Sequence, residues 1–151
     1  MSIGEFCNRE VIISNREDSI LDAAKLMRKF HVGDVVVVDQ RGDARVPVGI
    51  LTDRDIVVEI VAREADASKI SVGDTMSDEL LTVNENGQLT DLIEQMKGKA
   101  VRRVPVVDDN GALVGIVTAD DLVDLIAEQL NSLVGMVQRE QHREWSTRII
   151  G

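Results

Sequence analysis

Two Thr-x-x-Asp pairs are the residues whose types and spacing most clearly could do chemistry. Thr52 and Asp55 stand three residues apart, and Thr118 and Asp121 repeat this arrangement 66 positions later. A carboxylate at a strand-to-helix junction could accept hydrogen bonds from two sugar hydroxyls, and the amides of the helix start could bind a phosphate. The same spacing is that of a capping box, in which hydroxyl and carboxylate satisfy backbone amides. Local sequence favours the capping box, and the binding interpretation remains as the alternative.

The remaining candidates for chemistry are few. His31 and His142 are the only histidines, and Cys7 is the only cysteine, so neither an intrachain disulfide nor a thiolate metal cluster can form. No Ser-His-Asp set and no Gly-rich phosphate loop is discernible. Four carboxylates could attract magnesium if the two junctions met: Asp53, Asp55, Asp120 and Asp121. We interpret them as two helix starts, and we expect no catalytic residue and no resident metal.

The composition is that of a chain with an aliphatic core. Of its 151 residues, 44% are hydrophobic, 29% are charged and only 2% are aromatic. The net charge of −10 argues against DNA and anionic membranes as partners, because both favour a basic surface. No stretch approaches the roughly 18 apolar residues of a membrane span, and residues 1–20 do not have the pattern of a signal peptide. We therefore expect a cytoplasmic protein.

The sequence contains an internal repeat. VGILTDRD at 48–55 and VGIVTADD at 114–121 are its most similar parts. A shift of 69 residues aligns most of 3–42 with 72–111, and three extra residues near 44–46 then reduce the shift to 66. Two copies are too few for a solenoid and predict two similar lobes that face each other. The expected organisation is a first domain at 1–62, a linker at 63–71, a second domain at 72–128 and a C-terminal helical extension at 129–151.

Each copy has the same predicted order of elements, β-α-β-β-α. A short strand at 11–13 or 80–83 precedes a helix whose apolar residues recur at i, i+3, i+4 and i+7, which is one helical face. These residues are Ile20, Ala23, Ala24 and Met27 in the first copy and Leu89, Leu92, Ile93 and Met96 in the second. The β-branched runs at 35–38 and 104–107 predict strands covered on both faces. We expect an α/β (α+β) fold whose two lobes are related by a pseudo-twofold axis with two equivalent clefts.

The tail predicts one long helix. Residues 119–145 contain no proline, acidic residues gather early and arginines late, and this gradient suits the helix macrodipole. A short coiled-coil-like seam runs through Ile126, Leu130, Leu133 and Val137, with Gly135 interrupting it. We expect the helix to take part in forming a homodimer, and the alternative is a helix folded back on its own lobe.

These features together resemble a known family. The aliphatic-Gly-Ile-x-Thr-x-x-Asp junctions at 48–55 and 114–121, the RRVPVVD stretch at 102–108 and the tandem repeat are similar to a pair of cystathionine-β-synthase (CBS) domains, a Bateman module. The resemblance covers residues 3 to about 128. It implies a regulatory sensor of adenosine-containing ligands such as AMP, ADP or ATP, with S-adenosylmethionine as a known variant.

The resemblance also implies roles for particular residues. Asp55 and Asp121 would accept hydrogen bonds from the ribose hydroxyls, with Thr52 and Thr118 beside the ribose and phosphate. The purine would rest against the start of the first strand and the backbone before the second. Those positions are Ile12, Ile13, Asp34 and Val35 in the first lobe, and Leu81, Thr82, Arg103 and Val104 in the second.

The two copies differ at positions that matter for such a ligand. The second copy has Pro105 where the first has Val36, which favours the second for binding the base. The first has Arg54 where the second has Asp120. Because arginine can clamp a phosphate and aspartate repels it, the first copy is favoured for the phosphate.

We therefore expect a regulatory module and not an enzyme. A nucleotide would shift the arrangement of lobes or subunits, an unidentified effector protein would respond, and magnesium would be present only if the nucleotide carried it. One alternative is a constitutive dimerisation or docking module whose clefts stay empty. Another is a weak metal-dependent hydrolase that uses the junction carboxylates.

Overall fold

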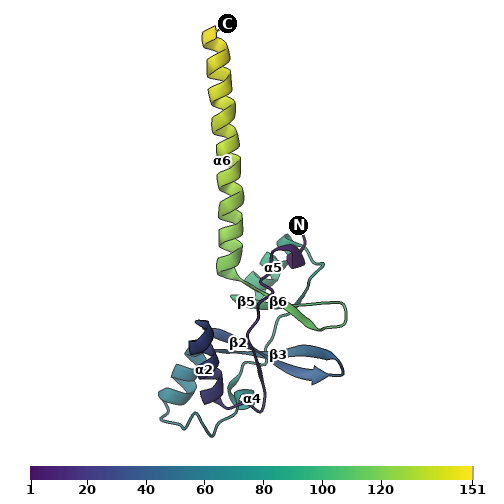
Figure 1. Cartoon of the computed structure of the whole chain (residues 1–151), viewed down its shortest axis with the longest axis vertical. Coiled ribbons are helices and arrows are strands. Elements are labelled where there is room, and N and C mark those ends of the chain that lie inside the picture. The colour runs from purple at the N-terminus through teal and green to yellow at the C-terminus, as the bar shows by residue number, and fades with distance from the viewer. Residues whose placement is uncertain (151) are drawn as a thin grey trace. The chain divides into compact units, whose positions relative to one another are not determined.

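The computed structural model describes residues 1–150, without the side chains of Ile149 and Ile150. The chain divides into two compact units, residues 1–117 and residues 118–151. The first unit holds the two repeats with their sheets, and the second is the C-terminal helix (Figure 1).

The first repeat forms a three-stranded sheet of order β1-β2-β3. Its elements are β1 (Ile13–Asn15), α2 (Ile20–Phe30), β2 (Asp34–Arg41), β3 (Ala44–Thr52), α3 (Asp53–Ile56) and the π-helical turn η1 (Val57–Val61). Strand β1 is parallel to β2, with Ile13 opposite Val36, and β2 is antiparallel to β3, with Asp34 opposite Thr52. This pairing places the Thr52 end of β3 beside the start of β2.

The second repeat forms a sheet of the same order, β4-β5-β6. Its elements are α4 (Val72–Thr75), β4 (Val83–Asn84), α5 (Leu89–Lys99), β5 (Arg103–Val107) and β6 (Leu113–Thr118). The predicted mixed α/β fold of two similar lobes is thereby confirmed. Two details differ: the first strand of each lobe begins later than expected, and the helix after Thr52 is one short turn that continues as η1.

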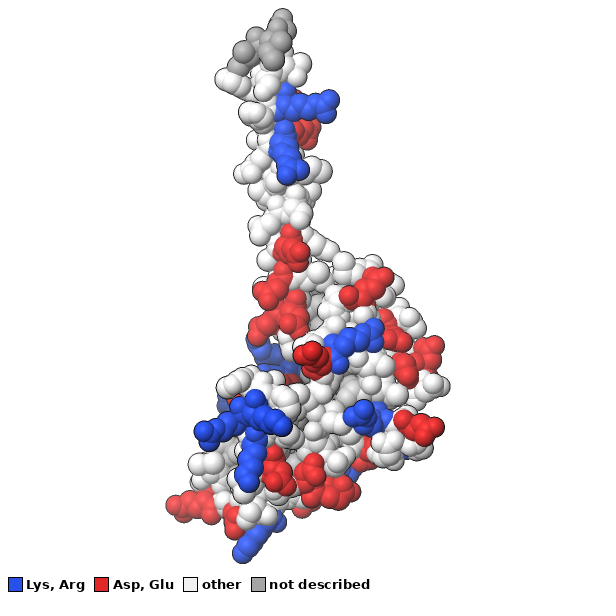
Figure 2. Space-filling model, viewed as in Figure 1, with Lys and Arg blue, Asp and Glu red and all other residues white. Residues whose placement is uncertain are grey.

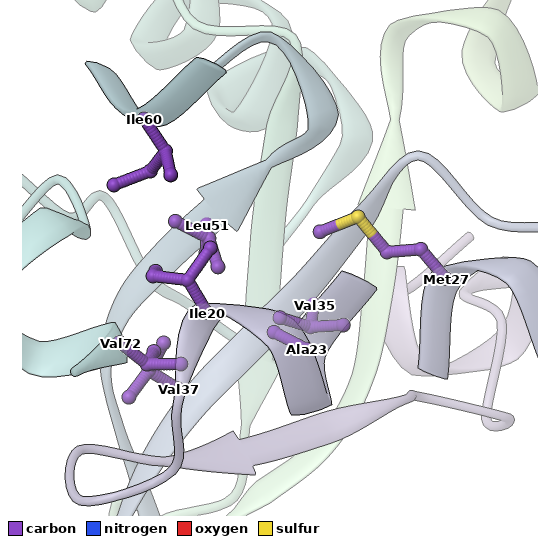
Figure 3. Close-up of a cluster of buried hydrophobic side chains, with 8 residues drawn as sticks. All are labelled: Ile20, Ala23, Met27, Val35, Val37, Leu51, Ile60 and Val72. Carbon is purple, nitrogen blue, oxygen red and sulfur yellow. The ribbon is translucent and has the colours of Figure 1, made fainter. Parts of the chain in front are cut away.

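Strand β2 is buried on both faces, as its run of valines predicted. Alternate side chains point to opposite sides of a strand, so Val35 and Val37 face α2 whereas Val36 and Val38 face the other way. The first pair joins a core with Ile20, Ala23, Met27, Leu51, Ile60 and Val72 (Figure 3). The second pair packs against Ile116 of β6. One face of the first sheet therefore completes its own lobe, and the other contacts the second repeat.

The short leading helix of each repeat packs on the opposite lobe. Helix α1 (Ile3–Phe6) is bound to the second lobe, where the Ile3 amide donates to the Gly87 carbonyl at 3.0 Å. Helix α4 is bound to the first lobe, where the Val72 amide donates to the Asp18 carbonyl at 2.8 Å. Val72 is also fully buried in the first core. The two repeats are thus interlocked by an exchange of their leading segments.

This exchange explains the glycine in each copy of VGI. A Cβ atom on Gly49 would lie 2.5 Å from Met76 Sδ and 2.8 Å from the Ser77 carbonyl oxygen. On Gly115 it would lie 2.6 Å from Cys7 Sγ and 2.9 Å from the carbonyl oxygen of the next residue, Asn8. The exchanged segment crosses the strand so closely that no side chain fits beneath it.

The second unit is one long helix, α6 (Ala119–Ile150), which confirms the continuous helix predicted for the tail. Its first turn is acidic and its last turn carries Arg148. Negative charge thus lies at the positive end of the helix macrodipole and positive charge at its negative end, which stabilises the helix. Figure 2 shows acidic side chains near its start and an uncharged band in its middle on the visible face. None of the described helices is both long enough and apolar enough to cross a membrane.

Candidate functional site

The first Thr-x-x-Asp pair forms a complete capping box. Thr52 Oγ1 accepts a hydrogen bond from the Asp55 amide at 3.1 Å, and Asp55 Oδ2 accepts one from the Thr52 amide at 2.9 Å. The helix begins here because both side chains satisfy amides that have no partner within the first turn. The capping interpretation is therefore confirmed at this junction.

The second pair repeats this geometry at the start of α6. Thr118 Oγ1 accepts from the Asp121 amide at 3.1 Å, and Asp121 Oδ2 accepts from the Thr118 amide at 3.3 Å. In both copies the cap uses only Oδ2 of the aspartate. Neither hydrogen bond of the first capping box uses Oδ1 of Asp55, so this capping carboxylate retains an oxygen that can accept from a ligand.

A cavity of about 250 Å³ lies beside Asp55. Its walls come from the end of β3, from the segment after α4, and from the residues that lead into β5. They are Ile50, Thr52, Asp55, Ser77, Glu79, Leu80, Leu81, Val101, Arg102 and Arg103. Both repeats therefore contribute to one site, which combines aliphatic surface with carboxylate and guanidinium groups.

Two further hollows share walls with this cavity. One of about 340 Å³ shares Asp55 and Ser77 and continues along η1 to Arg63. The other, of about 350 Å³, shares Leu81 and Val101 and reaches Lys99. Drug-sized ligands occupy pockets of about 300–1,000 Å³, a range that the two adjoining hollows reach and the cavity beside Asp55 approaches.

Arg103 is held by an ion pair with Asp34. Its Nε lies 3.1 Å from Asp34 Oδ2, and the Asp34 side chain is only 17% exposed. The same Oδ2 has no hydrogen bond of acceptable geometry among the described residues, so the contact is a close ion pair with poor alignment. Burial raises the pKa of Asp34, the nearby Arg103 opposes that rise, and Asp53 adds to it.

Asp34 and Arg103 occupy the same position in the two repeats, because they are separated by the repeat shift of 69 residues. The lobes are related by an approximate twofold axis, and this axis brings Asp34 of the first repeat into contact with the equivalent residue of the second, Arg103. Opposite charges at that position allow an ion pair where identical charges would repel. The cavity thus has one arginine whose orientation depends on a buried carboxylate.

The structure brings four of the expected site residues together in this cavity: Thr52, Asp55, Leu81 and Arg103. The apolar wall beside Asp55 comes from Leu80, Leu81 and Val101 of the second repeat. For the first lobe, the resemblance had implied Ile12 and Ile13 as purine contacts. Those two residues pack against the cores of the first unit. Asp34 does not line the cavity and is linked to it only through the ion pair with Arg103.

The other expected residues lie elsewhere. Val35, Val104 and Pro105 are buried within their sheets, and Thr82 is half-buried beside β4. Arg54 is exposed on α3 and is not part of the cavity wall. Thr118 and Asp121 belong to the capping box of α6.

Several residues that line the cavity were not expected from the sequence: Ser77, Glu79, Leu80 and Val101. Ser77 arrives there because its backbone pairs with Ile50, at 3.1 and 3.3 Å, as part of the exchanged segment. The only sequence signal for this crossing is the glycine at position 49. Among the described residues, no group of three His, Cys, Asp or Glu side chains could hold a metal ion.

The fold defines a duplicated α/β module with a cleft that both repeats line. The CBS domain family model matches residues 3–62 and 72–128, and the chain belongs to this family. Proteins of this family are generally ligand-sensing regulatory modules without catalytic activity.

Individual proteins show the same relationship. The chain is 34% identical to an uncharacterized protein of Methanopyrus kandleri over 83% of its own length, and it spans 62% of that relative. It is 37% identical to the CBS domain-containing protein YhcV of Bacillus subtilis, over 80% of this chain and 82% of YhcV. The CBS domain pair of protein MJ0100, solved with 5′-methylthioadenosine and S-adenosyl-L-methionine, is similar at a TM-score of 0.73 and 27% identity, covering 85% of this chain and 98% of that one.

Proposed function

We propose that the chain is a regulatory module that binds an adenosine-containing nucleotide, such as AMP, ADP or ATP, in the cleft beside Asp55. The observation that carries this proposal is the convergence of Asp55, Leu81 and Arg103 on one cavity from three separate segments. These side chains offer a hydrogen-bond acceptor, an apolar surface and a cation. A ribose, a purine and a phosphate need those three kinds of contact.

Asp55 is the proposed ribose contact. Its Oδ2 caps the helix, and its Oδ1 is available to accept from a hydroxyl. Because Oδ2 has further lone pairs, a carboxylate fixed in this way can accept from both hydroxyls of a ribose without releasing the cap. The capping role and the binding role are therefore compatible.

Leu80, Leu81 and Val101 are the proposed contacts of the purine. They form the aliphatic part of the cavity and continue into the adjoining hollow that reaches Lys99. A flat aromatic base gains from burial against such surface by about 25 cal/mol per Å² of apolar area. The other residues expected to contact the base do not line the cavity, and the proposal gives them a role only through their backbone. They are Ile12, Ile13, Val35, Thr82, Val104 and Pro105.

Arg102 and Arg103 are the proposed phosphate contacts in this cleft. Both line the cavity, and a guanidinium can bind phosphate oxygens in a bidentate manner. Arg54, exposed one residue before Asp55, is a second candidate for a longer phosphate chain. Magnesium would enter only with the nucleotide. S-adenosylmethionine has no phosphate, so only its methionine carboxylate could pair with these arginines.

The regulatory step that we propose is a shift between arrangements of lobes or subunits in a homodimer, to which an effector protein responds. A ligand shifts such an equilibrium only by its different affinity for the two arrangements. The ion pair between Asp34 and Arg103 supplies a difference of this kind, because a phosphate on Arg103 competes with Asp34. Thr118 and Asp121, which have the same local geometry, are proposed to play the equivalent role in a second site.

The test is calorimetric titration of the purified chain with AMP, ADP, ATP and S-adenosylmethionine, with and without magnesium. Asp55→Asn should weaken the binding of the best ligand by about tenfold to a hundredfold, because it removes a charge-assisted hydrogen bond. Asp22→Asn is the matched control: Asp22 also follows a helix-capping residue, Ser19, by three positions, and it does not line the cavity.

The control should bind like the wild type. Absence of binding by all four ligands would contradict the proposal and leave the alternative of a constitutive docking module. Equal affinities of Asp55→Asn and the wild type, with intact circular dichroism spectra, would limit Asp55 to its capping role. Hydrolysis of a nucleotide during the titration would instead indicate the metal-dependent hydrolase.

A further inference from the structure

Helix α6 presents a stripe of large apolar side chains to solvent. The stripe consists of Val123, Ile126, Leu130, Leu133 and Val137, which are between 42% and 64% exposed. Their spacing of three and four residues places them on one face of the helix over about two heptads. A contiguous exposed apolar face of this kind marks an interaction surface.

The surroundings of the stripe favour a helical partner. Residues 129–138 include no charged side chain, and the exposed Val134 and Met136 widen the stripe on both sides. The opposite side of α6 is polar or small, with Asp124, Asn131 and Gly135. A hollow of about 770 Å³ beside that side is bounded by α6 alone, so it is not an enclosed site.

We propose that this stripe binds the same stripe of a second copy of the chain, with the two α6 helices antiparallel. The inference rests on the proposed self-association and identifies its surface. A second copy fits because the charges of the helix complement themselves when the helix is reversed. The charges of its first third are all acidic (Asp120, Asp121, Asp124 and Glu128), and its three arginines lie near its end (Arg139, Arg143 and Arg148), among Glu140 and Glu144.

The residues beyond Val137 decide the orientation. Glu140 and Glu144 continue the spacing of the stripe. In a parallel pair in register, each glutamate would face its own counterpart within the interface, and like charges directly opposed are destabilising. In the antiparallel pair, Glu140 faces Val123 of the second copy, and the acidic start of one helix lies along the end of the other that carries the arginines.

The antiparallel register has four apolar layers. Ile126 faces Val137 of the second copy, Leu130 faces Leu133, and the twofold axis generates the same contacts in reverse. Such an interface is self-complementary, as closed twofold dimers require. Gly135 lies on the far side of the helix from the stripe, so it does not interrupt these layers.

The test measures the mass of the full-length chain by analytical ultracentrifugation over a range of concentrations. Leu130→Glu combined with Leu133→Glu should raise the dissociation constant by about a hundredfold or more, because each copy would place two charges in the apolar layers. Asn131→Glu combined with Ser132→Glu adds the same charge on the opposite face and should leave the dissociation constant close to that of the wild type. Circular dichroism should show equal helix content for all three proteins.

A wild-type monomer at micromolar concentration would overturn both self-association and this inference. Self-association that Leu130→Glu with Leu133→Glu leaves unchanged would overturn the inference alone and place the contact elsewhere. A loss of nucleotide binding is not expected from either variant, so the result is independent of the outcome at the Asp55 cleft.

Cysteine cross-linking tests the orientation, in a Cys7→Ser background. Ile126→Cys and Val137→Cys chains, mixed and oxidised, should form a mixed disulfide. Neither chain alone should cross-link. In the antiparallel pair, the two copies of either cysteine position are separated by 11 residues along the helix axis, which is about 16 Å. Cross-linking of Val137→Cys with itself would show a parallel pair and overturn the antiparallel assignment.

Discussion

The two strand-to-helix junctions begin alike and continue differently. Both Thr-x-x-Asp pairs make the same two capping hydrogen bonds. The first junction is followed by one α-helical turn and the π-helical turn Val57–Val61, and the second by the 32-residue helix α6. After Asp55 the chain is rich in β-branched residues, which lose side-chain freedom in a helix, whereas leucine, glutamine and glutamate recur after Asp121. A capping box thus sets where a helix begins, and the following residues set how it continues.

The largest expected effect tests the equivalence of the two glycines beneath the exchanged segments. Gly49→Ala should lower the free energy of unfolding by about 2–3 kcal/mol, because its Cβ would clash with the Ser77 carbonyl oxygen, a backbone atom. Gly115→Ala should cost a similar amount through the carbonyl of Asn8. Urea unfolding followed by circular dichroism measures both.

Gly98→Ala is the control for these two changes. A Cβ at Gly98 in α5 would have no atom within 4 Å, so alanine should stabilise the chain by about 0.5–1 kcal/mol. If Gly49→Ala were as stable as the wild type, the exchanged segment would not lie against β3 as described.

A smaller effect is expected at the two caps. Thr52→Ala and Thr118→Ala should each cost about 1 kcal/mol, because each leaves one helix-start amide without its acceptor. Serine at either position should restore most of the loss, since its hydroxyl can accept the same hydrogen bond. Thermal unfolding of the four variants compares them, and a cost at only one junction would contradict the equivalence of the two capping boxes.

The smallest effect concerns the repeat position that carries Asp34 in one copy and Arg103 in the other. Because burial raises the pKa of Asp34 above its ordinary 3.8, the folded chain binds more protons than the unfolded chain just above that pH. The wild type should therefore lose stability relative to Asp34→Asn as the pH rises from about 4 through the raised pKa. Unfolding in urea at several pH values measures this difference.

Arg103→Gln sharpens that comparison. This variant lacks the charge that opposes the rise of the Asp34 pKa. The stability of Arg103→Gln, compared with that of the double variant Arg103→Gln with Asp34→Asn, should therefore decline more steeply with pH and continue to decline to higher pH. Parallel pH profiles for the wild type and Asp34→Asn would show that the carboxylate is not desolvated as described.

The sequence predicted the parts of the fold that depend on local periodicity. The valines at 35–38 and the i, i+3, i+4, i+7 pattern from Ile20 to Met27 specify a doubly buried strand and an amphipathic helix, and both are present. The Thr-x-x-Asp spacing predicted both caps. The exchange of α1 and α4 was not predictable in this way, because it depends on backbone pairing between residues such as Ser77 and Ile50, far apart in sequence.

The same limit applies to the candidate site. Asp55, Leu81 and Arg103 were individual candidates from the sequence, but the repeat gave no indication of which other segments would line the cleft. The crossing of the chain after α4 places Ser77 and Glu79 beside Asp55. Which lobe provides a wall is decided by the route of the chain, and periodicity carries no information about that route.

The interlocked leading segments have a consequence for the order in which the protein can fold during synthesis. The first lobe lacks Val72, a fully buried part of its core, until the ribosome has released residues well beyond the first repeat. The segment at Asn8 must wait still longer, since its backbone partner is Ile116. A nascent chain would therefore expose unfinished strand edges to chaperones for most of its translation, and the two lobes would become complete almost together.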